Sequence, residues 1–230
     1  MQFRAYLFDV QGTLLNFFSP VQTAVTQYLA AHGASDVDAA AFTRSWRQNY
    51  LERIRRVPQS REKWRRIQKE YQDGFSDVCV LHGLPEPDHA AAKAVAKSWR
   101  NLEPWPDVQA GIARIREKAI TASLSNTDMS VAIGLFKRLD IGMDAIFAAE
   151  IFGAVKPELQ VYKQAVTYLG LRPEETAMVA SHPYDLEAAH SVGLGTIFVS
   201  RPLEYGYAAF AHDMAAESVT QHVQSIGEIE

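Results

Sequence analysis

The side chains in this sequence that could carry chemistry are two carboxylates, a lysine and small polar groups. Asp9 follows a short apolar run, and Asp185 lies a few residues beyond another. Lys156 precedes a proline, and Ser125 and Asn126 end a further apolar run. On its local sequence alone, Asp9 fits a turn-capping aspartate as well as a catalytic one. Two carboxylates, a lysine and hydroxyl or amide donors that converge on one edge would instead form a nucleophile site.

These residues must be positioned by the strands that precede them, and the sequence predicts an α/β fold. Short apolar runs alternate with helical patterns, which is typical of a parallel sheet covered by helices on both faces. Such sheets bind ligands beyond the carboxyl ends of their strands, so we expect the polar residues to meet at that edge. Strands are expected at 5–8, 120–124, 145–148, 177–180 and 195–199, with helices opening near 107, 128, 157 and 184.

A long segment between the first two strands has helical character and no strand pattern. Its first helix is expected to start at Ser19-Pro20, with Ser19 as the N-cap, and to end at Gly33. We predict a core domain of residues 1–15 and 103–230, and an inserted all-helical cap domain of residues 16–102 above the ligand-binding edge. The other cap helices are expected over 37–57, from a Ser60 cap to Gly83, and from near Pro87 to before Pro104.

The composition excludes several other classes of protein. With 47% hydrophobic and 22% charged residues, the 230-residue chain is typical of a globular protein. A formal net charge of -4 gives no reason to expect nucleic acid or an anionic membrane as a partner. Cys79 is the one cysteine, so an internal disulfide and a cysteine metal cluster are excluded. No apolar run approaches the ~20 residues that span a bilayer, and we expect a cytoplasmic protein.

Four segments in order along the chain resemble the motifs of the haloacid dehalogenase superfamily. The resemblance implies a hydrolase with a Rossmann-like parallel sheet and an inserted helical cap, acting through an aspartate nucleophile. It covers essentially the whole chain. The first motif is Phe8-Asp9-Val10-Gln11-Gly12-Thr13-Leu14, the second Ser125-Asn126, the third Lys156-Pro157, and the fourth Ser181 to Asp185.

Within that superfamily the chain is most similar to the L-2-haloacid dehalogenase (type II) group. Ser45-Trp46-Arg47-Gln48 resembles the segment that carries the group's substrate-binding arginine, and Tyr162 follows Lys156 by six residues as in that group. Without the resemblance, Arg47 would be read as a surface arginine, and Tyr162 fits a packed helix aromatic equally well. The resemblance also implies a homodimer.

The expected reaction is displacement of the substituent at C2 of a small carboxylic acid, with no cofactor and no metal. Asp9 would form an ester with C2, and a water oriented by Asp185 would cleave it. Lys156 would hold Asp9 ionised, and Arg47 would bind the leaving anion or the substrate carboxylate. The catalytic set is thus Asp9, Thr13, Arg47, Ser125, Lys156 and Asp185, with Thr13, Ser125 and Asn126 placing carboxylate oxygens; the substrate-binding set is Gln11, Arg47, Ser125, Asn126, Tyr162, His182 and Tyr184.

Three departures from the group's pattern leave the leaving group open. Gln11 stands where the group has a tyrosine, which suggests a more polar substrate. His182 replaces an asparagine beside the hydrolytic water, where it would act as a base or hydrogen-bond the loop. Tyr184 replaces a tryptophan and makes the pocket wall smaller. The alternative that keeps this chemistry is an L-azetidine-2-carboxylate hydrolase, or another hydrolase of a C–N or C–X bond, since an amine leaving group suits Gln11 and His182.

Two further alternatives belong to other classes. A magnesium phosphatase of this superfamily uses a second aspartate two residues after the nucleophile, and Gln11 cannot transfer a proton there. These phosphatases also hold magnesium with an added carboxylate in the fourth motif. The matching position in this chain is Ser181, so the usual set of magnesium ligands is incomplete. A non-catalytic binding protein on the same fold is the last alternative, and the joint presence of Asp9, Lys156 and Asp185 argues against it.

Overall fold

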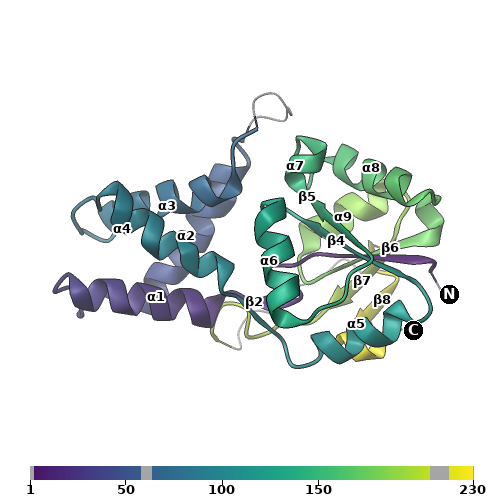
Figure 1. Cartoon of the computed structure of the whole chain (residues 1–230), viewed down its shortest axis with the longest axis horizontal. Helices are drawn as coiled ribbons and strands as arrows, with labels where there is room; N and C mark the ends of the chain where they lie inside the picture. Colours follow the sequence, from purple (N-terminus) through teal and green to yellow (C-terminus); the bar gives the residue numbers. More distant parts are fainter. Residues whose placement is uncertain (1–2, 58–63, 208–217, 230) are drawn as a thin grey trace.

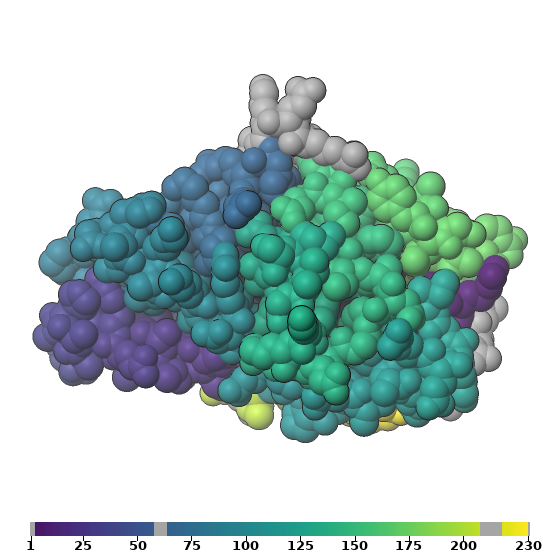
Figure 2. Space-filling view, in the orientation of Figure 1, coloured from purple at the N-terminus to yellow at the C-terminus, as the bar shows by residue number. Residues whose placement is uncertain are grey.

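The computed structural model describes residues 3–57, 64–207 and 218–229. It consists of a sheet flanked by helices, here called the sheet part, and a group of helices beside it, here called the helical part (Figure 1). In the space-filling view the helical part, coloured purple through blue to teal, lies directly against the sheet part (Figure 2).

Within the described residues, six strands form one parallel sheet in the order β5-β4-β1-β6-β7-β8. Strand β1 is central, and its last residue Phe8 is in register with Ser123 of β4 and Val179 of β6. The loops after β1, β4 and β6 therefore leave the sheet at the same edge. The strands are β1 Ala5–Phe8, β4 Ile120–Ser125, β5 Ala145–Ala148, β6 Thr176–Ala180, β7 Gly195–Val199 and β8 Gln221–Val223.

Helices cover both faces of the sheet because successive strand side chains point to opposite faces. Tyr6 and Phe8 belong to the apolar cluster that includes side chains of α5 and α6, whereas Leu7 belongs to the one that includes α8 and α9. Both faces of β1 are buried, which is why its sequence is uniformly apolar. The helices are α5 Val108–Arg116, α6 Met129–Leu139, α7 Ala149–Phe152, α8 Leu159–Leu169 and α9 Pro183–Ser191, with 3₁₀ turns η2 Pro173–Glu175 and η4 Ile226–Glu228.

The helical part begins and ends at a short antiparallel strand pair, β2 Leu15–Asn16 with β3 Glu103–Pro104. The two ends of the helical part thus meet beside the Asp9 loop. The centre of the helical part is aromatic: the rings of Tyr71 and Trp99 stack with centroids 4.1 Å apart, and the Trp46 Nε1–H donates to the Tyr71 carbonyl at 2.9 Å. The helices are α1 Phe18–Ala31, α2 Ala39–Ile54, α3 Ile67–Leu81, α4 His89–Ala96 and η1 Lys97–Arg100.

A carboxylate of the sheet part binds the start of a helix in the helical part. The buried Asp128, at the N-terminus of α6, accepts hydrogen bonds from the backbone N–H groups of Ile67 and Gln68, both at 2.9 Å. These are first-turn amides of α3 that have no partner within the helix itself. The contact therefore joins the two parts.

The five predicted strands are observed, and helices occur in every predicted interval. Ser19 is not the N-cap: the N-cap is Phe17, two residues earlier, and α1 begins at Phe18, whose N–H donates to Asn16 Oδ1 at 2.9 Å. The predicted cap Ser60 lies outside the described residues. The strands β2, β3 and β8 were not expected. Among the described residues, no helix has the length and apolar character needed to cross a membrane.

Candidate active site

Asp9 lies immediately after β1, nearly buried, with a cation at each carboxylate oxygen. Lys156 Nζ donates to Oδ1 at 2.9 Å, whereas Oδ2 lies 2.7 Å from Thr13 Oγ1 and 3.0 Å from His182 Nδ1. Burial alone would raise the pKa of Asp9, but Lys156 and His182 lower it far below its usual value. Asp9 is therefore an ionised carboxylate in a site closed to water, which is the state a nucleophile needs.

Lys156 also binds the second carboxylate. Its ammonium donates to Asp185 Oδ2, and the Tyr162 hydroxyl donates to Asp185 Oδ1. Burial would lower the pKa of Lys156, but Asp185 and Asp9 raise it, so the amine stays charged. Burial raises the pKa of Asp185, and the charge of Asp9 adds to this effect against the opposing charge of Lys156. Asp185 thus has a higher proton affinity than Asp9, although one ammonium binds both.

His182 connects Asp9 to a third carboxylate that sequence reasoning missed. Its Nε2 lies 2.8 Å from Glu204 Oε1, and Glu204 is only 1% exposed. Because both ring nitrogens face carboxylate oxygens, which only accept hydrogen bonds, both must carry protons. Burial alone would lower the pKa of His182, but Glu204 and Asp9 raise it to about 10. The ring is therefore an imidazolium at neutral pH.

Gly12 makes room for this carboxylate. Its φ is +93°, which is unfavourable for residues with a side chain, and a Cβ there would lie 2.3 Å from Glu204 Oε1. The Gly-Thr turn of the first motif is thus needed for two reasons, the backbone conformation and the close approach of Glu204. Nothing in the local sequence of Glu204, within a loop after β7, indicated that it would reach this turn.

Arg47 reaches the Asp9 loop from α2 of the helical part. Its Nη1 donates to Gln11 Oε1 at 3.1 Å, and the Tyr71 hydroxyl donates to the same oxygen at 2.6 Å. The guanidinium carbon lies 4.8 Å from the ring centroid of Phe17 and 5.2 Å from that of Tyr50, so aromatic faces stabilise its charge. Among the described residues, the buried donors Arg47 Nε and Gln11 Nε2 have no hydrogen-bond partner. Two such donors on residues that contact each other favour an acceptor ligand.

The remaining predicted residues support the site less directly. Asn126 exchanges two hydrogen bonds with the backbone of Lys156, at 2.7 and 3.0 Å, and Ser125 Oγ accepts from the Thr127 N–H at 3.3 Å. Asn126 thus fixes the backbone of Lys156, and of the three residues expected to position carboxylate oxygens Thr13 hydrogen-bonds Asp9. The same role for Ser125 and Asn126 stays a prediction. Tyr184 stacks on His182, with ring centroids 5.4 Å apart.

The donor set at this site differs from one that suits a divalent cation. The position between Asp9 and Asp185 is taken by the Lys156 ammonium, and Ser181 hydrogen-bonds Thr13 instead of adding a carboxylate. Among the described residues, no group of three or more His, Cys, Asp or Glu side chains is arranged to hold a metal ion. The charge of Asp9 is neutralised by two side chains, those of Lys156 and His182.

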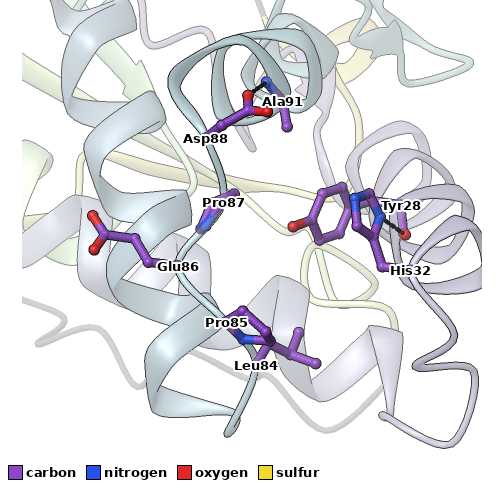
Figure 3. A pocket seen from close by; sticks show the side chains of 8 residues that line it. All are labelled: Tyr28, His32, Leu84, Pro85, Glu86, Pro87, Asp88 and Ala91. Atoms are coloured by element: carbon purple, nitrogen blue, oxygen red, sulfur yellow. Dashed lines mark hydrogen bonds between the residues drawn. The ribbon is translucent and has the colours of Figure 1, made fainter.

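A separate pocket of about 230 Å³ lies on the helical part, between α1 and the start of α4 (Figure 3). Tyr28 and His32 form one wall, and the segment 84–88 with Ala91 forms the other. None of the predicted site residues lines it, so it is distinct from the Asp9 cluster. The carboxylate of Asp88 in this pocket caps α4 by accepting from the Ala91 N–H at 2.7 Å.

Comparisons with known proteins agree on one family. A family model described as haloacid dehalogenase-like hydrolase matches residues 3–193. The (S)-2-haloacid dehalogenase 4A of Burkholderia cepacia is 28% identical over 92% of this chain and 90% of its own. A solved L-2-haloacid dehalogenase is 31% identical, with a TM-score of 0.85 over 97% of this chain and 95% of its own. A solved defluorinating L-2-haloacid dehalogenase is 32% identical, with a TM-score of 0.87 over 98% and 92%.

Proposed function

Because the chain belongs to the haloacid dehalogenase-like hydrolase family, we propose that it is a hydrolase that displaces the substituent at C2 of a small 2-substituted carboxylic acid. The reaction is that of a 2-haloacid dehalogenase, proceeds through an ester at Asp9, and uses neither a metal nor a cofactor. Residues 16–102 serve as a cap over a core of residues 1–15 and 103–230.

The contact between Arg47 and Gln11 carries this proposal. It places a permanently charged side chain beside the loop of the nucleophile, with unpaired N–H groups on both partners. A substrate carboxylate or a departing anion supplies the missing acceptors, and a guanidinium binds such groups through planar paired donors. Both Asp9 and Arg47 are nearly buried, so the substrate is small and enters when the cap moves away.

The reaction runs in two steps. In the first, a carboxylate oxygen of Asp9 forms a bond to C2, and the substituent leaves with the electron pair of its former bond. In the second, a water oriented by Asp185 adds to the Asp9 carboxyl carbon and releases a 2-hydroxy acid. Lys156 keeps Asp9 ionised for the first step, and exclusion of bulk water protects the ester until the ordered water attacks.

A phosphatase activity fits the site poorly. A phosphate ester needs an acid that protonates its leaving oxygen, and the position two residues after Asp9 holds an amide. Gln11 Oε1 already accepts from Arg47 and Tyr71, so this amide is fixed as part of the Arg47 contact. Attack by an anionic Asp9 on a phosphate dianion would also be opposed by charge repulsion, whereas a neutral sp³ carbon presents no such barrier.

The imidazolium of His182 favours L-azetidine-2-carboxylate hydrolysis as a second candidate. The azetidine nitrogen needs a proton when its bond to C2 breaks, whereas a departing halide needs none. His182 holds a proton on the nitrogen that faces Asp9, 3.0 Å from Oδ2. The two candidates share the ester at Asp9 and differ only in the group that departs.

The test measures chloride release from (S)-2-chloropropionate, fluoride release from the 2-fluoro analogue and ring opening of azetidine-2-carboxylate. Turnover in heavy-oxygen water, followed by mass spectrometry of the peptide that contains Asp9, locates the solvent oxygen. We expect label in the Asp9 carboxylate and no activity in Asp9→Asn. The matched control is Asp36→Asn, which changes an exposed carboxylate of the helical part.

Solvent oxygen that enters the product directly, with none in Asp9, would rule out the ester route. Hydrolysis of p-nitrophenyl phosphate that EDTA abolishes, without turnover of any 2-substituted acid, would favour the phosphatase. Ligand binding with no turnover, unchanged in Asp9→Asn, would favour a binding protein.

A further inference from the structure

We infer that His182 is a catalytic residue of the second step, in which it donates its Nδ1–H to Asp9 Oδ2 while water adds to the ester, and that Glu204 is the positioning residue that keeps it protonated. This inference rests on the proposed ester at Asp9. It assigns a chemical role to the hydrogen-bonded row of Asp9, His182 and Glu204.

The hydrogen bonds of Asp9 distinguish its two oxygens. Each carboxylate oxygen has two lone-pair positions. On Oδ2, both are occupied among the described residues, by the Thr13 hydroxyl at 2.7 Å and His182 Nδ1 at 3.0 Å. On Oδ1, the Lys156 ammonium occupies one at 2.9 Å, and one remains for attack on carbon. Oδ1 therefore becomes the ester oxygen bonded to C2, and Oδ2 becomes the carbonyl oxygen.

This assignment makes Thr13 and His182 a preformed oxyanion hole. When water adds, its oxygen bonds to the Asp9 carboxyl carbon and the C=O π pair moves onto Oδ2, where two donors already point. The proton that the water loses passes to Asp185, whose pKa is raised by burial. The bond from the carboxyl carbon to the product oxygen then breaks, Oδ2 regains its double bond, and the product oxygen takes the proton from Asp185. Asp9 releases its own proton to solvent and returns to the carboxylate.

Glu204 keeps the donor in place during the step that needs it. Esterification removes the charge of Asp9, so the ring loses one of the two anions that favour its protonation. Glu204 still accepts from Nε2 at 2.8 Å and is almost fully buried, so the imidazolium remains paired. Among the described residues, the titratable groups shown in contact with the ring include Asp9, Glu204 and the stacked Tyr184, with Lys156 beyond Asp9. An anion at Nε2 orients the ring so that Nδ1–H points at Oδ2.

The test separates formation of the ester from its hydrolysis. Wild-type enzyme and variants are mixed with (S)-2-chloropropionate, quenched in acid at increasing times, and weighed as intact protein, so that ester and free Asp9 appear as two masses. Released chloride is measured in the same samples. The variants are His182→Ala, His182→Asn and Glu204→Gln, and the control is Glu174→Gln, which removes an exposed carboxylate paired with Arg172.

In His182→Ala we expect ester hydrolysis to slow by about 10²–10³-fold, the usual effect of removing one oxyanion donor. Ester formation should change much less, so the ester accumulates and chloride appears in a burst that matches the amount of enzyme. His182→Asn should recover part of the lost rate, because its amide still donates. As the pH is raised, the rate of ester hydrolysis in Glu204→Gln should begin to fall at a lower pH than in wild type. The reason is that the His182 ring loses its proton more easily without the Glu204 charge. Glu174→Gln should behave as wild type.

Two failures can be told apart. If His182→Ala and Glu204→Gln form and hydrolyse the ester at wild-type rates, the role of His182 is refuted and the ester route stands. If wild type releases chloride but places no heavy oxygen in Asp9, and no variant accumulates an ester, the proposed function itself fails. A loss of ester formation equal to the loss of hydrolysis, in folded variants, would assign His182 to positioning Asp9 instead.

Discussion

Removal of the Lys156 charge provides a sharp test of how the site is held together. Lys156→Met keeps most of the side-chain volume but leaves Asp9 and Asp185 buried without the ammonium that binds both. Removing one partner of a buried ion pair costs about 3–5 kcal/mol of unfolding free energy, and here two carboxylates lose the same cation. Against a total of about 5–15 kcal/mol for a folded domain, the loss is large and measurable by urea unfolding followed by tryptophan fluorescence.

The pH dependence identifies the cause of this loss. In wild type the depressed pKa of Asp9 gives stability that is present above the ordinary aspartate pKa of about 4 and disappears as pH falls below it. In Lys156→Met the pKa of Asp185, already raised by burial, rises further, so the folded variant takes up a proton that the unfolded chain does not hold. The variant is then stabilised as pH falls from 7 towards 5, and its deficit relative to wild type shrinks.

Two further variants complete this experiment. The double variant Lys156→Met/Asp185→Asn removes one of the unpaired charges, so it should recover part of the stability at pH 7 and lose most of the pH dependence. Lys137→Met, at an exposed position on α6, should unfold as wild type does. A deficit that stays constant between pH 7 and 5, or a double variant less stable than the single one, would refute the electrostatic reasoning.

Three other substitutions test separate contacts. Arg47→Lys removes the planar donors beside Gln11, and a lost charge-assisted hydrogen bond of about 1.5–3 kcal/mol predicts a 10- to 100-fold fall in kcat/KM on (S)-2-chloropropionate. Asp128→Ala removes the acceptor at the start of α3 and should lower the free energy of unfolding by about 1 kcal/mol. Amide hydrogen exchange in the first turn of α3 should become faster, and unchanged exchange would show that the contact does not stabilise this turn. Gly12→Ala forces a side chain into a φ of +93° and against Glu204, so both thermal stability and activity should fall; wild-type values would contradict the close approach.

The order of strands and helices was predictable because burial on both faces of the sheet leaves uniformly apolar strands. Ala5–Phe8, for example, is buried throughout and contains no polar residue. The strands β2 and β3 were not predictable, since each has two residues and no periodicity can be detected over that length. They pair because the chain leaves and re-enters the sheet part at one place, which is a consequence of the tertiary fold. Ser19 failed as an N-cap for a related reason, since the competing acceptor Asn16 comes three residues earlier.

The site was predictable where a residue lies in one of the four motifs and unpredictable where it comes from a segment outside them. Lys156 and Asp185 lie beyond strand ends, so the parallel sheet brings them to Asp9. Glu204 is in a loop that turns back over the Gly12 turn, and its carboxylate is 22 residues from the histidine that it binds. Local sequence patterns do not predict that a loop folds back over another loop in this way. The local sequence alone would also have placed Arg47 on the surface, whereas the aromatic side chains of the helical part bury it.

The five charged groups at the centre of the site alternate in sign, and this order has a consequence for the proposed intermediate. Asp185, Lys156, Asp9, His182 and Glu204 follow one another through direct hydrogen bonds, with three anions and two cations. Conversion of Asp9 to an ester removes the central anion and leaves two neutralised ion pairs, one on each side of the reacting carbon. Without Glu204, the same conversion would leave the imidazolium buried with no anion, at a cost of several kcal/mol. An asparagine in place of His182 would need no such partner, so the charge of His182 explains why a buried carboxylate, Glu204, lies against its Nε2.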